Sequence, residues 1–186
     1  MDLTTVLLVL LVIAVVVLYL SQTAARLDRL HHRVDTSRTA LQGQFMDRAN
    51  EVLSLASAGR LDPASSMLLA DAADSALAQG RTGGDAFDLP RCAAESALTK
   101  ALDAALEAPE VVEELLSQPD GEQTLSDLGA AVQKAAWSRR FHNDAVRSCL
   151  AVRKQRLVRV FRLAGSAPLP RTVELDDEVP APLRSR

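Results

Sequence analysis

Three polar side chains of this sequence stand where the surrounding helical pattern calls for apolar residues. Arg139 and His142 interrupt a stripe of apolar residues at steps of three and four, and Arg48 lies on an earlier stripe of the same kind. Two amides, Asn50 and Asn143, accompany them. Buried guanidinium and amide groups must be hydrogen-bonded or paired. These five residues therefore predict a polar layer, which either fixes the register of packed helices or binds a ligand or partner.

The sequence contains none of the common motifs that carry catalytic chemistry. It has no glycine-rich phosphate loop, no H-E-x-x-H or G-x-S-x-G motif and no Nudix-type cluster. His31 and His32 are adjacent rather than at metal-binding spacing, and no Glu-x-x-His pair of a di-iron bundle occurs. Cys92 and Cys149 form no C-x-x-C pair. We therefore predict no catalytic residue, no metal site, no cofactor and no enzymatic activity.

Composition indicates that helices position the polar residues. The 186 residues are 48% hydrophobic but only 3% aromatic, and Ala and Leu are abundant. A β-sandwich or barrel needs more aromatic residues than this, and the length suits one domain. We expect an all-α fold.

An apolar run at the N-terminus predicts a membrane anchor over residues 1–25. No charge lies between Asp2 and Arg26, and residues 3–20 are almost entirely Leu, Val, Ile and Ala. As a helix this run extends about 27 Å, close to the roughly 30 Å of a hydrocarbon core. A cleaved signal peptide is the alternative, because Thr23-Ala24-Ala25 resembles a cleavage site. The long apolar run, with no Lys or Arg before it, favours a retained anchor.

Basic residues on one side of the anchor predict its orientation. Only the amino terminus and Asp2 precede the run, whereas arginines follow it closely, and the positive-inside rule places such residues in the cytoplasm. We expect the N-terminus outside and the body of the protein in the cytoplasm, at the cell membrane. The basic residues after the anchor are Arg26, Arg29 and Arg33.

Proline, glycine and hydrophobic periodicity divide the remaining chain into four helical segments. The anchor continues as an amphipathic helix that Gly59 ends, Asp62-Pro63 begins the next helix, and Pro109 kinks or breaks the third. Short turns favour an antiparallel up-down-up-down bundle over residues 26–164. Four prolines and an acidic run predict an irregular tail over residues 165–186. The expected helices cover residues 26–58, 63–80, 90–116 and 124–164, with a loop at 81–89.

The end of the fourth predicted helix is strongly basic. In an antiparallel bundle it returns to the basic residues after the anchor, so both sets meet at the inner membrane face, where anionic lipid attracts cations. A solvated basic helix end is the alternative. Nucleic acid is disfavoured, because the whole chain has a net charge of −3 and carries no recognition motif. The basic residues at this end are Arg153, Lys154, Arg156, Arg159 and Arg162.

Straight helices also bring the polar residues to one level. Arg48 and Asn50 lie about 33–36 Å beyond Arg26, and Arg139 and Asn143 lie about 32–38 Å before the expected end of the fourth helix. The nearest acidic partners in sequence are Asp47, Glu51 and Asp144.

Parts of the sequence resemble the LemA family. Residues 138–147, SRRFHNDAVR, are similar to the family segment aRrfYNdaVr. A family spacing V-x6-V-x3-L-x2-R-x-D is matched after the anchor, and residues 170–175 are similar to the family's tail. Asn50 replaces the usual Asp, as in a distant, actinobacterial-type member. The second match comprises Val34, Leu41, Phe45, Arg48 and Asn50.

The resemblance implies a single-pass protein with a long antiparallel four-helix cytoplasmic bundle and no established biochemical activity. Together with the missing catalytic motifs, this favours a non-enzymatic scaffold or interaction module that associates with itself or another protein, in envelope maintenance or membrane-stress response. The alternative is a ligand-binding or weakly catalytic bundle that uses Arg48, Arg139, His142 and Asn143.

Overall fold

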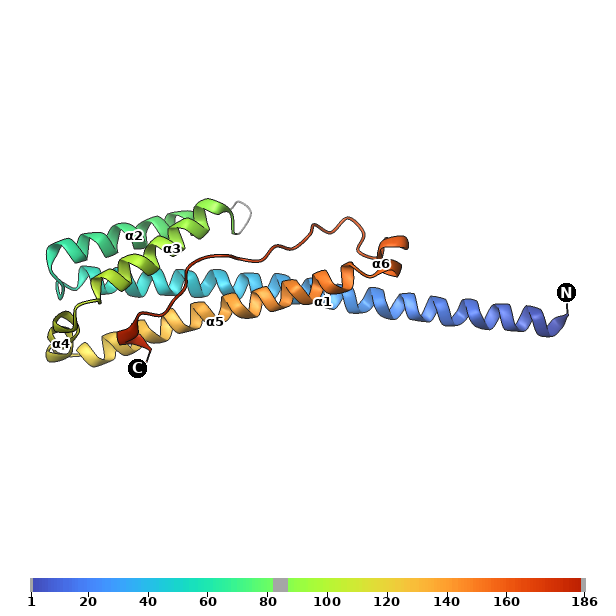
Figure 1. The fold of residues 1–186 in the computed structure, drawn as a ribbon, viewed down its shortest axis with the longest axis horizontal. Helices are drawn as coiled ribbons and strands as arrows, with labels where there is room; N and C mark the ends of the chain where they lie inside the picture. The colour runs from blue at the N-terminus through green and yellow to red at the C-terminus, as the bar shows by residue number, and fades with distance from the viewer. Residues whose placement is uncertain (1, 82–86, 185–186) are drawn as a thin grey trace. The chain divides into compact units, whose positions relative to one another are not determined.

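The computed structural model describes residues 2–81 and 87–184 and is helical throughout its regular parts (Figure 1). No strand occurs in these two ranges. The middle of the loop expected at 81–89 lies outside the described residues. The elements are α1 (Leu3–Ser57), α2 (Pro63–Arg81), α3 (Leu89–Ala105), α4 (Pro109–Ser117), α5 (Gly121–Arg153), α6 (Arg156–Val160) and a short 3-10 helix, η1 (Ala181–Leu183).

Helix α1 contains the apolar run and continues without a break into the amphipathic segment. By length and composition it can cross a membrane, and it is the single helix of the described residues that meets this test. None of its most apolar window is buried against the rest of the chain. The expected long apolar N-terminal helix is therefore present.

Local sequence signals account for several helix ends. Gly59 adopts a φ of +65°, a left-handed conformation that glycine tolerates and that ends α1. The Asp62 carboxylate accepts hydrogen bonds from the backbone N–H groups of Ala64 and Ser65 at 2.9 and 3.1 Å. A hydrogen bond from the Ser65 side chain, together with these backbone bonds, lowers the pKa of Asp62. Asp88 caps α3 in the same way, through the N–H of Arg91 at 3.1 Å. The starts of α2 and α3 are thus set by capping aspartates that precede them in the sequence.

The long fourth helix expected over residues 124–164 is wrong at both ends. Helix α5 begins at Gly121 after Asp120, whose φ is +60°, and Thr124, already inside the helix, donates its hydroxyl to the backbone oxygen of Asp120. Helix α5 ends at Arg153, and the separate helix α6 follows. No proline or glycine lies at this break. The Arg153 guanidinium instead donates to the backbone oxygens of Ala167 and Pro168, both at 2.8 Å, and thereby holds the chain that folds back after α6.

The chain forms two compact units. The first unit comprises Met1–Thr36 and Asn143–Thr172, and the second comprises Ser37–His142 and Val173–Arg186. The core of the first unit is small and consists of residues from α1, α5 and α6. These residues are Leu27, Val34, Ala145, Val146, Cys149, Val152 and Val158.

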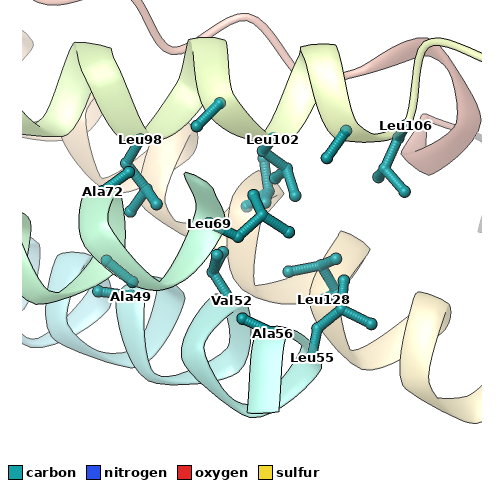
Figure 2. Packing of buried hydrophobic residues seen from close by; sticks show 14 of the residues in the cluster. Ala49, Val52, Leu55, Ala56, Leu69, Ala72, Leu98, Leu102, Leu106 and Leu128 are labelled. Carbon is teal, nitrogen blue, oxygen red and sulfur yellow. The ribbon is translucent and has the colours of Figure 1, made fainter. Parts of the chain in front are cut away.

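The second unit holds the larger core, to which α1, α2, α3, α4 and α5 all contribute. Helices α2 and α3 lie side by side (Figure 1). Figure 2 shows Leu69 of α2 between Val52 of α1 and Leu102 of α3, all of them at most 1% exposed. Alanines at positions 49, 72, 73, 76 and 101 line the same core. Small side chains let these helices approach closely, while the leucines supply most of the buried apolar area.

Leu69 and its neighbour Leu68 provide a matched test of this core. Leu69 is fully buried, whereas Leu68 is 48% exposed. Leu69→Ala should lower the free energy of unfolding by about 2–5 kcal/mol, and Leu68→Ala by about 0.5 kcal/mol or less. Denaturant unfolding of the full chain in detergent micelles, followed by the fluorescence of Trp137, measures the second unit. Equal effects of the two substitutions would contradict the packing of α2.

Candidate functional site

A buried ion pair joins α1 to α3 inside the second unit. The Arg48 Nη2 atom donates to Glu95 Oε2 at 2.6 Å and to the Glu95 backbone oxygen at 3.1 Å. Both side chains are 2% exposed. The Arg48 guanidinium also lies over the Phe45 ring, 5.4 Å from its centroid, in cation–π geometry. Arg48 is therefore buried because Glu95 and an aromatic face accompany it.

Burial affects the charge state of Glu95. Removal from water raises the pKa of the Glu95 carboxyl, and the positive charge of Arg48 opposes that shift. Desolvation is the larger of the two influences. The pair therefore fixes a helix contact at an electrostatic cost, as buried ion pairs in other proteins commonly do.

Thr99, one turn after Glu95 on α3, extends the polar contacts to the C-terminal tail. Its Oγ1 atom accepts a hydrogen bond from Arg48 Nη1 at 3.2 Å and donates to the backbone oxygen of Asp176 at 2.9 Å. The backbone N–H of Asp176 donates to Ser96 Oγ at 3.0 Å. Two hydroxyl residues of α3, one helical turn apart, thus bind both backbone groups of Asp176.

Arg139 of α5 binds the next residue of the tail. Its Nε and Nη2 atoms donate to the two carboxylate oxygens of Asp177 at 2.7 and 2.8 Å, and Nη1 donates to the backbone oxygen of Val173 at 3.3 Å. This bidentate geometry is the strongest form of arginine–carboxylate pairing. The bonds to Asp177 raise the pKa of the Arg139 guanidinium further. Arg139 is thus a clamp on the tail.

Apolar contacts hold the tail at both ends of this polar stretch. Val173 is 1% exposed and packs with Leu41 and Phe45, and Leu183 is fully buried. A Cβ atom at Gly129 would lie 3.2 Å from the Leu183 backbone oxygen, which leaves little room for a side chain there. Residues 173–184 contain only one short helical turn, η1, yet they pack as part of the second unit.

His142 has different neighbours from the two arginines. It is 2% exposed, and its Nδ1 atom lies 3.0 Å from Ser37 Oγ. The centroid of its ring lies 5.8 Å from the centroid of the Phe87 ring. Asn143 is buried in the first unit, whereas Asn50 is exposed on α1. The structure thus places Arg48, Arg139 and His142 in one unit with separate partners, and it does not place Asn50 in a buried layer.

The acceptors expected from sequence proximity are not the ones that bind the arginines. Asp47 and Glu51 are exposed, and Asp144 pairs with Arg147. Glu95 and Asp177, the acceptors that the structure shows, lie 47 and 38 residues from Arg48 and Arg139. A weak signal for Glu95 existed, because it adjoins a row of small and apolar residues at helical spacing, and Thr99 follows one turn later. The row comprises Ala94, Leu98, Leu102 and Ala105. Asp177 lies in an acidic run that gave no reason to prefer it over its neighbours.

The basic residues expected at a membrane surface all belong to the first unit. Arg153 is half-buried by its bonds to the returning chain, and the others are exposed. A hollow in this unit is lined by Arg26 and Arg29 of α1 together with Val152 and Gln155 from the α5–α6 junction. The exposed basic residues are Arg26, Arg29, Arg33, Lys154, Arg156, Arg159 and Arg162.

Residues 2–81 and 87–184 contain two cysteines and no cluster of metal-ligating side chains. No group of three or more His, Cys, Asp or Glu side chains in these ranges has metal-binding geometry. Cys92 is half-buried and Cys149 is fully buried, and burial raises the pKa of both thiols. A raised pKa keeps a thiol protonated and less nucleophilic.

The buried ion pair can be tested by removing one partner and then both. Arg48→Met leaves the Glu95 carboxylate buried without its cation and should lower the free energy of unfolding by about 3–5 kcal/mol. Arg48→Met combined with Glu95→Leu removes both charges and should recover most of that loss. Denaturant unfolding of the full-length wild type, single variant and double variant measures these free energies. A double variant no more stable than Arg48→Met would contradict this account of the pair.

Arg139 and its exposed neighbour Arg140 provide a matched test of the tail clamp. Arg139→Leu removes three hydrogen bonds, and because the site is partly exposed, we expect a loss of about 1–2 kcal/mol. Backbone amides at 173–184 should also exchange faster with solvent. Arg140→Leu should change neither the free energy of unfolding nor the exchange of these amides. Unchanged exchange in Arg139→Leu, measured by mass spectrometry, would show that the clamp does not hold the tail.

No protein-family model, curated protein or solved structure matches this chain.

Proposed function

We propose that this protein is a membrane-anchored interaction module. In this proposal α1 crosses the cell membrane once with its N-terminus outside, and the helical body faces the cytoplasm as a LemA-type antiparallel four-helix bundle. The body acts as a non-enzymatic scaffold that associates with itself or with another protein, in envelope maintenance or membrane-stress response. The supporting observation is the continuity of α1, which contains an exposed apolar run and extends without a break into the helical body.

The state of the buried polar residues supports an interaction module over a ligand-binding or weakly catalytic bundle. The guanidinium groups of Arg48 and Arg139 are bound to Glu95 and Asp177 of the same chain. A ligand carboxylate or phosphate would have to displace these acids, and a displaced Glu95 would remain buried without a cation, which is costly. The polar layer therefore suits a role in holding helices and tail together.

Exposed aromatic side chains offer a surface for a protein partner. Trp137 and Phe141, one turn apart on α5, are 53% and 65% exposed. A hollow beside Trp137 is lined by Arg140, Leu175 and Glu178 among others. Tryptophan and arginine are enriched at interaction hot spots, where an aromatic ring buries a large area and a charged rim gives specificity. We place the protein contact here.

The orientation is tested by thiol labelling in cells. Lys100 is exposed on α3, so Lys100→Cys, combined with Cys92→Ala and Cys149→Ala, provides a single reactive thiol in the body. A membrane-impermeant maleimide should label this thiol only after the cells are broken, because a cytoplasmic body is protected by the membrane. Labelling in intact cells would place the body outside and contradict the proposed topology.

The interaction surface is tested by photo-crosslinking in cells. A photoreactive phenylalanine analogue at Phe141 should give covalent adducts, either with a second copy of the chain or with another protein. The same analogue at Lys100, which is exposed on a different helix, is the control and should give few. Recovery of monomer alone from both positions would contradict the proposed scaffold role.

A further inference from the structure

Exposed apolar side chains gather in and after α6. Leu157, Val160 and Phe161 are 44%, 73% and 50% exposed, and Leu169 is 66% exposed. None of these four side chains belongs to a buried hydrophobic cluster of the chain. Outside the apolar run of α1, they form the most concentrated exposed apolar surface in the described part of the first unit.

The opposite side of α6 is fastened to α1. Val158 is 2% exposed and belongs to the same core as Leu27 and Val152. The turn after α6 is closed by a hydrogen bond from the Leu163 N–H to the Val158 oxygen at 3.0 Å, with Arg162 at a φ of +49°. Helix α6 therefore packs through Val158 into a core that α1 and α5 share, while its outer residues face away from that core.

That place lies at the end of the uncharged part of α1. Residues 3–25 carry no charge and extend about 35 Å as a helix, enough for a hydrocarbon core of about 30 Å. Leu27, which shares a core with Val158, comes two residues later. The hollow lined by Tyr19, Arg26 and Gln155 confirms that the α5–α6 junction reaches this level. Headgroups occupy about 5–8 Å on each side of the core, so α6 lies at headgroup depth when α1 spans a membrane.

The residues around α6 carry positive charge, which indicates the kind of surface that this helix can bind. Residues 145–173 contain no Asp or Glu, and the cations next to the exposed apolar side chains are themselves exposed. Cations alone would suit any phosphate. Cations interleaved with exposed Leu, Val and Phe suit an anionic lipid monolayer, where the apolar side chains enter the acyl boundary and the basic ones contact headgroups. These cations are Lys154, Arg156, Arg159 and Arg162.

We propose that residues 156–162 form a second membrane contact, an interfacial element that inserts Leu157, Val160 and Phe161 into the anionic monolayer beside α1. This inference rests on the proposed membrane anchoring of α1. Val158 fastens the element to α1, and Arg156, Arg159 and Arg162 bind lipid phosphate around it. The first unit then contacts the membrane at two points, the spanning helix and this surface element.

The test measures the depth of a fluorescent label in a bilayer. Val160→Cys, in a chain with Cys92→Ala and Cys149→Ala, carries a polarity-sensitive nitrobenzoxadiazole label. The full chain is reconstituted into vesicles of phosphatidylcholine with or without phosphatidylglycerol. In anionic vesicles the emission should shift to shorter wavelength, and lipids with nitroxide groups on their acyl chains should quench it several-fold more than in neutral vesicles.

Two control variants separate depth from charge. Thr36 is exposed on α1 about 14 Å beyond Leu27, so a label at Thr36→Cys should stay unquenched in both vesicle types. Adding Arg156→Gln and Arg159→Gln to the Val160→Cys chain should reduce quenching in anionic vesicles to the neutral-vesicle level. Both substituted arginines are exposed, so folding should be preserved.

The outcomes distinguish this inference from the proposed function. If the chain floats with vesicles but the Val160 label is quenched no more than the Thr36 label, α6 does not insert and the inference is wrong. If quenching of the Val160 label is the same with and without phosphatidylglycerol, and is unchanged by the arginine substitutions, the proposed selectivity for anionic lipid is wrong. A chain that fails to float with vesicles would instead contradict the anchoring of α1.

Discussion

A guanidinium with 2% exposure must have an acceptor inside the protein, and this constraint organises the second unit. Arg48 meets it with Glu95, which fixes where α1 crosses α3. Thr99 then bonds to both Arg48 and the backbone of Asp176, so the tail is placed by the same contact. Arg139 binds the adjacent Asp177 from α5. Helices from distant parts of the sequence and the tail therefore share one continuous set of polar contacts.

The two units use charge in opposite ways. In the second unit, the carboxylates of Glu95 and Asp177 neutralise Arg48 and Arg139, and these polar contacts are directed inward. In the first unit, most basic side chains are exposed around the end of the apolar run, and no acid occurs between residues 145 and 173. Ion pairs inside the second unit hold its helices together, whereas exposed basic side chains of the first unit suit contact with an anionic surface. This division underlies the proposal of a membrane-anchored interaction module.

Helix starts and stops were predictable where a local chemical signal exists. Gly59, the Asp62 cap and Pro109 mark boundaries that the structure has at or next to these residues. The end of α5 at Arg153 was not predictable, because no glycine or proline marks it. There the guanidinium of Arg153 binds carbonyl oxygens 14 and 15 residues further on, and this return of the chain exists only in the folded state.

The amino-acid sequence was sufficient to predict the helical character, the uncharged run of residues 3–25 and the positions of Arg48, Arg139 and His142 on apolar stripes. Each of these depends on composition or on spacing along one helix. The tertiary structure alone decided the partners: Glu95 for Arg48, Asp177 for Arg139, Ser37 for His142, and the packing of the tail. A hydrogen bond requires atoms about 3 Å apart, and only the fold brings together residues separated by 38 to 105 positions.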